Sequence, residues 1–203
     1  METPRRALVV VDVQNEYFQG PLTIKYPAPE EALEAIISAI ETAKTASIPV
    51  ALIQHENPAG ASVFASGSQS QRLHPSLEAL SDLPRFVKNK ASIFTSQGFT
   101  QWLADNQIDT VTLVGFMANN CLLASAAAAE TQAVSVEVIS DASGTINLGN
   151  RAGTINARHF HETLMVLLHS NWATVTDTET WKHAIHEDIP LTRSTLVTSA
   201  IAG

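Results

Sequence analysis

The sequence predicts an α/β fold of three layers (αβα), in which helices cover both faces of a mainly parallel sheet of five or six strands. Short runs of β-branched and apolar residues recur without polar alternation, as in strands that are buried on both faces. Amphipathic segments lie between many of these runs, and this alternation is typical of parallel sheets. The 203 residues are 45% apolar and show no linker or repeat, so we expect a single domain over residues 1–203.

The expected strands are apolar runs that end at polar residues. The first is ALVVV at residues 7–11, which Asp12 ends. The others are IPVALIQ at 48–54, VTLVG at 111–115, VSVEVIS at 134–140 and ATVTD at 173–177, and a short apolar pair at 86–87 precedes Lys88.

Four segments are expected to be helices. Residues 30–47 place Leu33, Ile36, Ile37 and Ile40 at helical spacing, with acidic residues in the first turn. Residues 100–106, 120–132 and 151–168 are the other candidates. The polar stretch 55–75 has no periodicity and is expected to form part of a pocket wall. The tail at 187–203 is expected to be either an arm on a neighbouring subunit or a frayed end.

Composition narrows the class of partner. Twelve basic and twenty acidic residues give a net charge of −8, which disfavours nucleic acid. The apolar run near the N-terminus, residues 7–11, is too short for a signal peptide or a membrane span. The single cysteine excludes a disulfide framework within the chain and fits a reducing compartment. We therefore expect a cytoplasmic protein that binds neither nucleic acid nor membrane.

Three reactive side chains follow expected strands, at the edge where open α/β sheets bind ligands. Cys121 begins a predicted helix, and the helix N-terminus together with Lys88 is expected to lower the pKa of its thiol. Asp12 is placed to accept the thiol proton and return it to a leaving group. Backbone amides at the helix start would stabilise an oxyanion. This chemistry is hydrolysis of an amide through a thioester, without a metal.

Each of these residues also has an ordinary structural explanation when it is considered alone. A lone cysteine is more often a small buried apolar group than a nucleophile. An aspartate at a strand end is commonly a turn former, and Lys88 beside Lys90 is typical of a solvated face. The order of the three residues along the chain is more informative than any one of them.

Asp12-Val-Gln at the end of the first strand, Lys88-Asn-Lys-Ala-Ser-Ile-Phe, and Gly115-Phe-Met-Ala-Asn-Asn-Cys121 occur in this order, and VEVISDASGT follows at 136–145. The pattern resembles the isochorismatase-like cysteine hydrolases of the isochorismatase/nicotinamidase superfamily, which have a Rossmann-like fold. The resemblance implies that Asp12 is the proton acceptor, Lys88 the stabilising cation and Cys121 the nucleophile.

The resemblance also implies features around the triad. The family has a non-proline cis peptide before the cysteine, which corresponds to Phe116–Met117, and the oxyanion donors would be the amides of Met117 and Cys121. The family forms symmetric assemblies, so a homo-oligomer, either a dimer or a tetramer, is expected. The chain departs from the family at Ala118, where threonine is common, and at Phe116 and Met117, where the family has small apolar residues.

No metal and no cofactor are expected. Nicotinamidase members of the family carry an Asp-x-His-x-x-His site near the second strand, whereas this chain has His55 alone. His159 and His161 lie two residues apart on a predicted helix and point to different faces. His183 and His186 lack a third ligand nearby, which indicates a solvated helix.

The substrate is expected to be a small amide-like molecule of unknown identity. The candidates to border its pocket are Gln14, Phe18, His55, Phe64 and Phe116. His55 follows the second strand directly, although an ordinary turn histidine is equally compatible with this position.

Three alternative functions share parts of this pattern. A vinyl-ether hydrolase is possible within the family, although that chemistry does not need the cysteine. A catalytically silent scaffold would have the same composition. A nucleotide- or flavin-binding module is disfavoured because DVQNEYFQG has a single glycine, eight residues past Asp12, where a phosphate loop would be glycine-rich.

Overall fold

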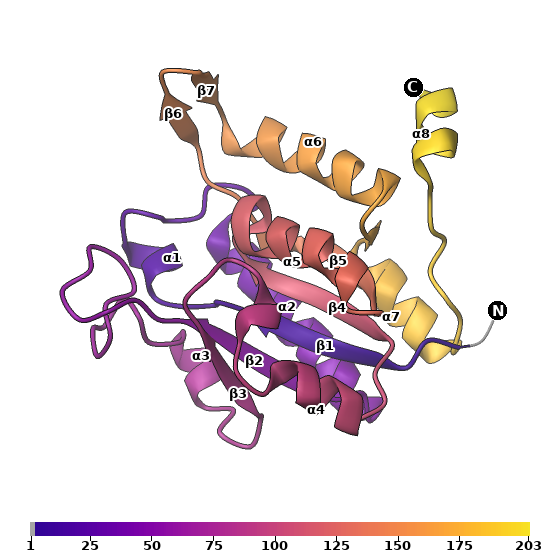
Figure 1. Ribbon diagram of the computed structural model, residues 1–203, viewed down its shortest axis with the longest axis horizontal. Helices are drawn as coiled ribbons and strands as arrows, with labels where there is room; N and C mark the ends of the chain where they lie inside the picture. The colour runs from indigo at the N-terminus through magenta and orange to yellow at the C-terminus, as the bar shows by residue number, and fades with distance from the viewer. Residues whose placement is uncertain (1–2) are drawn as a thin grey trace.

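The computed structural model describes residues 3–203, and its centre is a six-stranded sheet in the order β3-β2-β1-β4-β5-β8 (Figure 1). All neighbouring strands in this sheet are parallel. The strands are β1 (Arg6–Val11), β2 (Val50–His55), β3 (Arg85–Lys88), β4 (Thr110–Phe116), β5 (Ser135–Gly144) and β8 (Thr174–Thr176). This topology confirms the predicted α/β fold.

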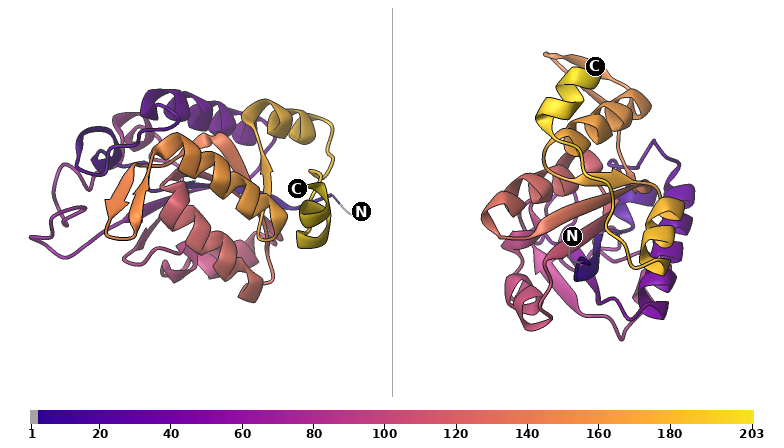
Figure 2. Two further views of the ribbon diagram at one scale, coloured as in Figure 1. Left: turned by 90° about the horizontal axis from the view of Figure 1, so that it is seen from above. Right: turned by 90° about the vertical axis from the view of Figure 1, so that its right-hand side faces the viewer.

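Helices form a layer on each face of the sheet (Figure 2). α2 (Pro29–Thr45) and α7 (Thr178–His186) cover one face, whereas α4 (Phe99–Asp105), α5 (Leu123–Ala128) and α6 (Ala157–Ser170) pack on the other. β1 explains why both layers are needed, because its side chains alternate between the two cores. Val9 and Val11 face the α5 layer, while Leu8 and Val10 face the α2 layer.

Two predicted helices differ from the observed ones. The helix expected at 151–168 starts only at Ala157, where Asn156 caps it by accepting a hydrogen bond from the His159 amide at 2.9 Å. The residues before it form an antiparallel hairpin of β6 (Leu148–Asn150) and β7 (Gly153–Ile155). The helix expected at 120–132 is a π-turn η2 (Ala118–Leu122), then α5, then a 3₁₀ turn η3 (Ala129–Thr131).

Short helical segments, which the sequence analysis did not predict, occupy several loops. α1 (Glu16–Gln19) follows the first strand, α3 (Pro75–Glu78) ends the long polar stretch, and η1 (Ile93–Thr95) follows β3. Within the long stretch, Phe64 is buried, so this segment packs onto the core despite its polar composition.

The C-terminal segment ends in a further helix, α8 (Leu196–Ala202), which none of the strands contacts closely (Figure 1). Thr195 forms a capping box at its start, yet none of its residues is buried. The chain leading to it is held by Arg6, whose Nη2 donates to the Ile189 carbonyl at 3.1 Å. In residues 3–203, no helix has both the length and the apolar character that crossing a membrane requires.

The carboxyl ends of β1 to β4 meet at one edge of the sheet, and one glycine determines how closely they meet. Gly115 has a φ of 108°, and a Cβ at this position would lie 2.1 Å from the Val11 carbonyl oxygen. Only glycine therefore allows β4 to pass beside the end of β1. The consequence is that the loop carrying Cys121 begins next to Asp12.

Candidate active site

Asp12, Lys88 and Cys121, from three distant parts of the chain, converge at this edge. Lys88 Nζ lies 2.6 Å from Asp12 Oδ2 and 3.4 Å from Cys121 Sγ. Their residues are almost completely enclosed, with 0%, 2% and 2% of the surface of Asp12, Lys88 and Cys121 exposed. A carboxylate, an ammonium and a thiol thus share one buried site, which is the group of residues that the motif order singled out.

Asp12 occupies an unusual backbone conformation directly after β1. Its φ of 51° is in the left-handed region, which aspartate tolerates better than most residues. Its amide donates to the Ile53 carbonyl at 2.9 Å, which fixes the turn against β2. Its Oδ1 is buried and receives no hydrogen bond from the part of the chain that the structure describes. This oxygen is therefore an acceptor available for a proton.

Lys88 carries the positive charge of the site. Burial lowers the pKa of Lys88, but the charges of Asp12 and Cys121 and the hydrogen bonds to them outweigh burial and raise that pKa above its usual value. Lys88 is therefore an ammonium at neutral pH. Its third neighbour is His55, whose Nδ1 lies 3.2 Å from Nζ.

The acidity of Cys121 differs from the sequence-based expectation of a lowered thiol pKa. Burial, and next the negative charge of Asp12, raise the pKa of Cys121 to about 12, although Lys88 acts in the opposite direction. The expected help from a helix dipole is weak, because Cys121 lies in a π-turn followed by a helix of six residues. Cys121 therefore rests as a neutral thiol, and nucleophilic attack requires transfer of its proton.

Ser125 ties the cysteine segment to the lysine segment, and the sequence analysis missed it. Its Oγ donates to the Cys121 carbonyl at 2.6 Å and accepts from the Ile93 amide at 3.0 Å. Ile93 lies five residues beyond Lys88 in the chain. The only signal in the sequence was a serine four residues after the cysteine, a spacing that also fits an ordinary helix–backbone bond.

The loop before the cysteine contains the peptide bond that the resemblance singled out, and the Phe116–Met117 bond is cis in the structure. The Met117 carbonyl accepts from the amides of Asn120 and Leu122 at 3.1 and 3.2 Å. These bonds fold residues 117–122 into one turn around Cys121, so the amides of Met117 and Cys121 belong to the same turn.

Aromatic rings form one wall beside the triad. Tyr17, which the sequence analysis did not select, packs against Phe64 and Phe116 with ring centroids 5.3 and 5.5 Å apart. Phe18 is half-buried and meets Phe116 edge-on at 5.8 Å. The structure thus brings three of the predicted pocket residues together around Tyr17, whose pKa is raised by burial and by the charges of Cys121 and Asp12.

Gln14 makes contacts of a different kind from those of the aromatic residues. It is fully buried, its Oε1 accepts from the His55 amide at 2.9 Å, and its Nε2 donates to the His55 carbonyl at 2.9 Å. This pair of bonds joins the end of β1 to the end of β2. Gln14 thereby fixes the backbone of His55.

The histidines do not form a metal-ligating cluster. In residues 3–203, no group of three or more His, Cys, Asp or Glu side chains is arranged to hold a metal ion. The two ring nitrogens of His55 face Lys88 Nζ and Asn57 Oδ1. His161 is buried beside Tyr26, with ring centroids 5.4 Å apart, and His159 is exposed on another face of α6. His183 and His186 are exposed on α7.

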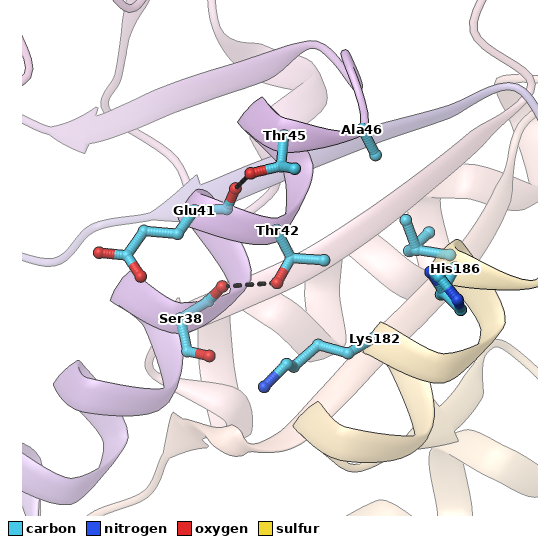
Figure 3. Close-up of a pocket in the computed structure, with 8 residues that line it drawn as sticks. Ser38, Glu41, Thr42, Thr45, Ala46, Lys182 and His186 are labelled. Carbon is cyan, nitrogen blue, oxygen red and sulfur yellow. Dashed lines mark hydrogen bonds between the residues drawn. The ribbon is translucent and has the colours of Figure 1, made fainter.

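The helix that carries His183 is not a purely solvated one, because Trp181 and Ala184 of α7 are buried. A cavity of about 530 Å³ lies between α2 and α7 (Figure 3). Two of the hydroxyls that line it are already bonded, since Thr42 donates to the Ser38 carbonyl at 2.9 Å and Thr45 to the Glu41 carbonyl at 2.8 Å. None of the residues that line this cavity belongs to the triad.

Comparison with solved structures shows a close relative. A putative isochorismatase from Burkholderia xenovorans LB400 is 38% identical, superposes with a TM-score of 0.95, and is matched over 98% of this chain and 96% of that one. A cysteine hydrolase from Pseudomonas syringae pv. phaseolicola is 18% identical with a TM-score of 0.83, covering 93% of this chain and 95% of that one, which shows the shared fold alone.

Sequence comparisons agree with the structural ones. An uncharacterized isochorismatase family protein of Bacillus subtilis, YddQ, is 26% identical over 175 residues, which are 85% of this chain and 96% of the relative. The secreted isochorismatase effector Isc1 of Verticillium dahliae is 28% identical over 142 residues, 70% of this chain and 74% of the relative. The family model for the isochorismatase domain matches residues 6–180. With this match and the shared fold, the chain belongs to the isochorismatase family of hydrolases.

Proposed function

We propose that this protein is a metal-independent cysteine hydrolase that cleaves a C–N bond of a small carboxamide through a thioester. The observation that carries the proposal is the position of Lys88 Nζ, which lies 2.6 Å from Asp12 and 3.4 Å from Cys121 in a buried site. Each of the three residues then has a distinct role. Asp12 transfers protons, Cys121 attacks the substrate and Lys88 stabilises the negative charge that moves between them.

Acylation begins with the proton of the resting thiol. This proton passes from Cys121 Sγ to Asp12 Oδ1. Among the described residues, no other group donates a hydrogen bond to this oxygen. The sulfur attacks the amide carbonyl carbon, and the amides of Met117 and Cys121 would donate to the resulting oxyanion. The C–N bond breaks as Asp12 returns the proton to the leaving nitrogen, which departs as ammonia or an amine. The acyl group remains on sulfur as a thioester.

Deacylation repeats the proton transfers with water. Asp12 accepts a proton from a water molecule, whose oxygen attacks the thioester carbon. The C–S bond breaks, and the proton on Asp12 restores the thiol of Cys121, so that the products are a carboxylic acid and the free enzyme. Lys88 stays protonated throughout, because its pKa is raised by both acidic neighbours in spite of its burial.

The surroundings of the sulfur favour a neutral substrate. The cation nearest the sulfur, Lys88, already pairs with Asp12, so it offers little to a substrate carboxylate. The wall formed by Tyr17, Phe64 and Phe116 is aromatic. A flat or apolar acyl group would pack against these rings.

Vinyl-ether hydrolysis is the second candidate, because several relatives are named isochorismatases. In that reaction Asp12 or Lys88 would protonate the substrate, and the sulfur would have no covalent role. The third candidate is a silent scaffold, which the high thiol pKa and the 2% exposure of Cys121 favour. The three candidates differ in the effect of Cys121→Ala. This substitution should abolish amide hydrolysis, leave vinyl-ether hydrolysis in place, and change nothing in a silent scaffold.

A screen of ammonia release over a panel of small carboxamides tests the proposal. Wild type is expected to release ammonia, and Cys121→Ala and Asp12→Asn are expected to lower kcat by at least about 10³-fold with unchanged circular dichroism. Hydrolysis that survives Cys121→Ala would contradict the thioester. A vinyl ether that both wild type and Cys121→Ala cleave supports the second candidate, and inertness toward both substrate classes supports the scaffold.

We also propose that the protein acts in the cytoplasm as a homo-oligomer, a dimer or tetramer, without a nucleic-acid or membrane partner. A single thiol that must stay reduced supports the location. The apolar residues that α6 and α8 leave exposed support the assembly, and they are Val166, Leu167, Leu196, Val197 and Ile201.

A further inference from the structure

His55 stands beside the triad, and the hydrogen bonds around it assign the positions of its protons. The Asn57 side chain donates through Nδ2 to the Val63 carbonyl at 3.0 Å, and a carbonyl can only accept. Asn57 Oδ1 therefore faces His55 Nε2, at 3.1 Å. Because Oδ1 is only an acceptor, Nε2 carries the proton. Nδ1 of the neutral ring is then left as an acceptor, and it points at Lys88 Nζ 3.2 Å away.

Lys88 needs one acceptor for each of its three ammonium protons, since an unpaired donor in a buried site is costly. Asp12 Oδ2 at 2.6 Å and Cys121 Sγ at 3.4 Å are two of these acceptors. His55 Nδ1 is the third. With all three in place, the ammonium has a single orientation, in which one N–H points at the sulfur.

The backbone makes this arrangement rigid. His55 and Lys88 are paired residues of the parallel strands β2 and β3, and the Glu56 amide donates to the Lys88 carbonyl at 2.9 Å. Gln14 holds both the amide and the carbonyl of His55, each at 2.9 Å. The imidazole ring packs against Phe64 with centroids 5.2 Å apart. The ring is therefore in contact with Lys88, Asn57 and Phe64.

We infer that His55 is a positioning residue that acts through Lys88. In its neutral form, with the proton on Nε2, it holds the lysine ammonium against both Asp12 and Cys121. Protonation of His55 would replace the acceptor at Nδ1 with a donor and place a second positive charge beside Lys88. The catalytic arrangement is therefore coupled to the protonation of one ring nitrogen, which is a different role from contact with substrate.

The groups around His55 decide how it responds to pH. Lys88 on β3 and Asp12 after β1 are the ionisable groups that act on it, with Cys121 beyond Lys88, while Asn57 is not ionisable. Burial and then the charge of Lys88 lower the pKa of His55 below its ordinary value of 6.5, against the opposing effects of Asp12 and Asn57. The neutral ring is therefore the form present at neutral pH, and activity should decline only in acid.

Two substitutions separate the acceptor from the shape of the ring. His55→Phe keeps a flat ring but removes the acceptor, whereas in His55→Asn the side-chain oxygen takes the place of Nδ1 and can still accept from Lys88. His55→Phe is expected to lower kcat about ten- to a hundredfold with little change in KM, and His55→Asn to retain most of the rate. The exposed His159→Phe is the matched control. Equal rates in His55→Phe and wild type would overturn the inference, as would an equal loss in His55→Asn.

The comparison of kcat and KM between these variants rests on the proposed function. A second measurement is therefore made on the protein without substrate. Long-range ¹H–¹⁵N spectra of the histidine rings at neutral pH are expected to show His55 with an unprotonated Nδ1 and a protonated Nε2.

Alkylation of Cys121 is a further test. Iodoacetamide is expected to alkylate Cys121 about tenfold more slowly in His55→Phe than in wild type, because Lys88 then stabilises the thiolate less well. A proton on Nδ1, or equal alkylation rates, would overturn the positioning role even if amides are hydrolysed. The expected spectrum and alkylation rates, without any turnover of amides, would instead refute only the proposed function.

The pH profile of kcat completes the test. Wild type is expected to lose rate in acid as His55 becomes protonated, and His55→Asn is expected to lack this part of the acid limb. An identical acid limb in both proteins would contradict the inference, because it would show that another group controls the decline.

Discussion

Arg6 and Glu137 form a buried ion pair near the amino ends of the strands, away from the triad. Arg6 Nη2 lies 3.0 Å from Glu137 Oε1, Arg6 Nε lies 3.0 Å from both carboxylate oxygens, and the two side chains are 3% and 5% exposed. Glu137 Oε2 also accepts from Thr112 Oγ1 at 2.7 Å and from Trp181 Nε1 at 3.3 Å. This network joins β1, β4 and β5 to α7.

Glu137→Ala is expected to lower the free energy of unfolding by about 3–5 kcal/mol, because it leaves the Arg6 guanidinium buried without its partner. Urea unfolding measures this loss. The double variant Arg6→Met with Glu137→Leu is the control, and it is expected to recover most of the stability because it removes both charges. A Glu137→Ala protein as stable as wild type would show that the ion pair has no structural role.

The raised pKa of the thiol leads to a prediction about reactivity. Because the pKa of Cys121 is about 12, alkylation by iodoacetamide should rise steadily with pH through the neutral and mildly alkaline range. Asp12→Asn removes the charge that raises this pKa, so it should speed alkylation at about pH 8 by roughly tenfold, while it abolishes turnover. Lys88→Met should slow alkylation, because Lys88 is the group that lowers this pKa. Mass spectrometry of the modified protein measures each rate, and a plateau below about pH 8 in wild type would contradict the assigned acidity.

The order of the motifs was sufficient to predict which residues would meet, because Asp12 and Cys121 follow strands of one parallel sheet and Lys88 ends another. The acidity of the thiol was not predictable in this way. It depends on the enclosure of the sulfur and on its distance from Asp12, and both are set by loops from other parts of the chain. Motif spacing carries no information about either quantity.

Hydrophobic periodicity had a similar limit. It located α2 and the central strands, whose apolar residues repeat over a full element. It missed the hairpin of β6 and β7, because three-residue strands are too short for a pattern of alternation. It also missed the polar partners of His55 and Cys121, since Asn57 and Ser125 are ordinary polar residues until the fold brings them to these two side chains.

Acid should destabilise the protein through its buried histidine, His161. Burial lowers the pKa of His161 below 6.5, against smaller opposing effects from the Ser140 backbone, Glu162 and Asp141, so below about pH 6.5 the unfolded chain binds this proton more readily than the folded one. The stabilisation is therefore complete above that pH and is lost as the pH falls toward the lower pKa of the folded state. The free energy of unfolding at about pH 7.5 and about pH 5.5 measures the loss.

His161→Gln provides the comparison, because glutamine stays neutral in both states. This variant should lose less stability between the two pH values than wild type does, whereas the exposed His159→Gln should lose the same amount as wild type. An unchanged pH dependence in His161→Gln would mean that other groups carry the effect.

The last prediction concerns α8, which is too short to be stable without packing. Isolated helices below about 12 residues are marginal in water, and α8 has seven residues with none buried. Val197 and Ile201 lie on one face of α8 and are 68% and 81% exposed, and Val166 of the neighbouring α6 is 71% exposed. A second copy of the chain could cover this surface symmetrically.

Light scattering after gel filtration should show an oligomer for wild type and a monomer for the double variant Val197→Asp with Ile201→Asp. The control is Ala46→Asp, which changes an exposed residue at the end of α2 and should leave the assembly intact. A monomeric wild type would exclude this interface, because the apolar face would then be solvated in the native protein.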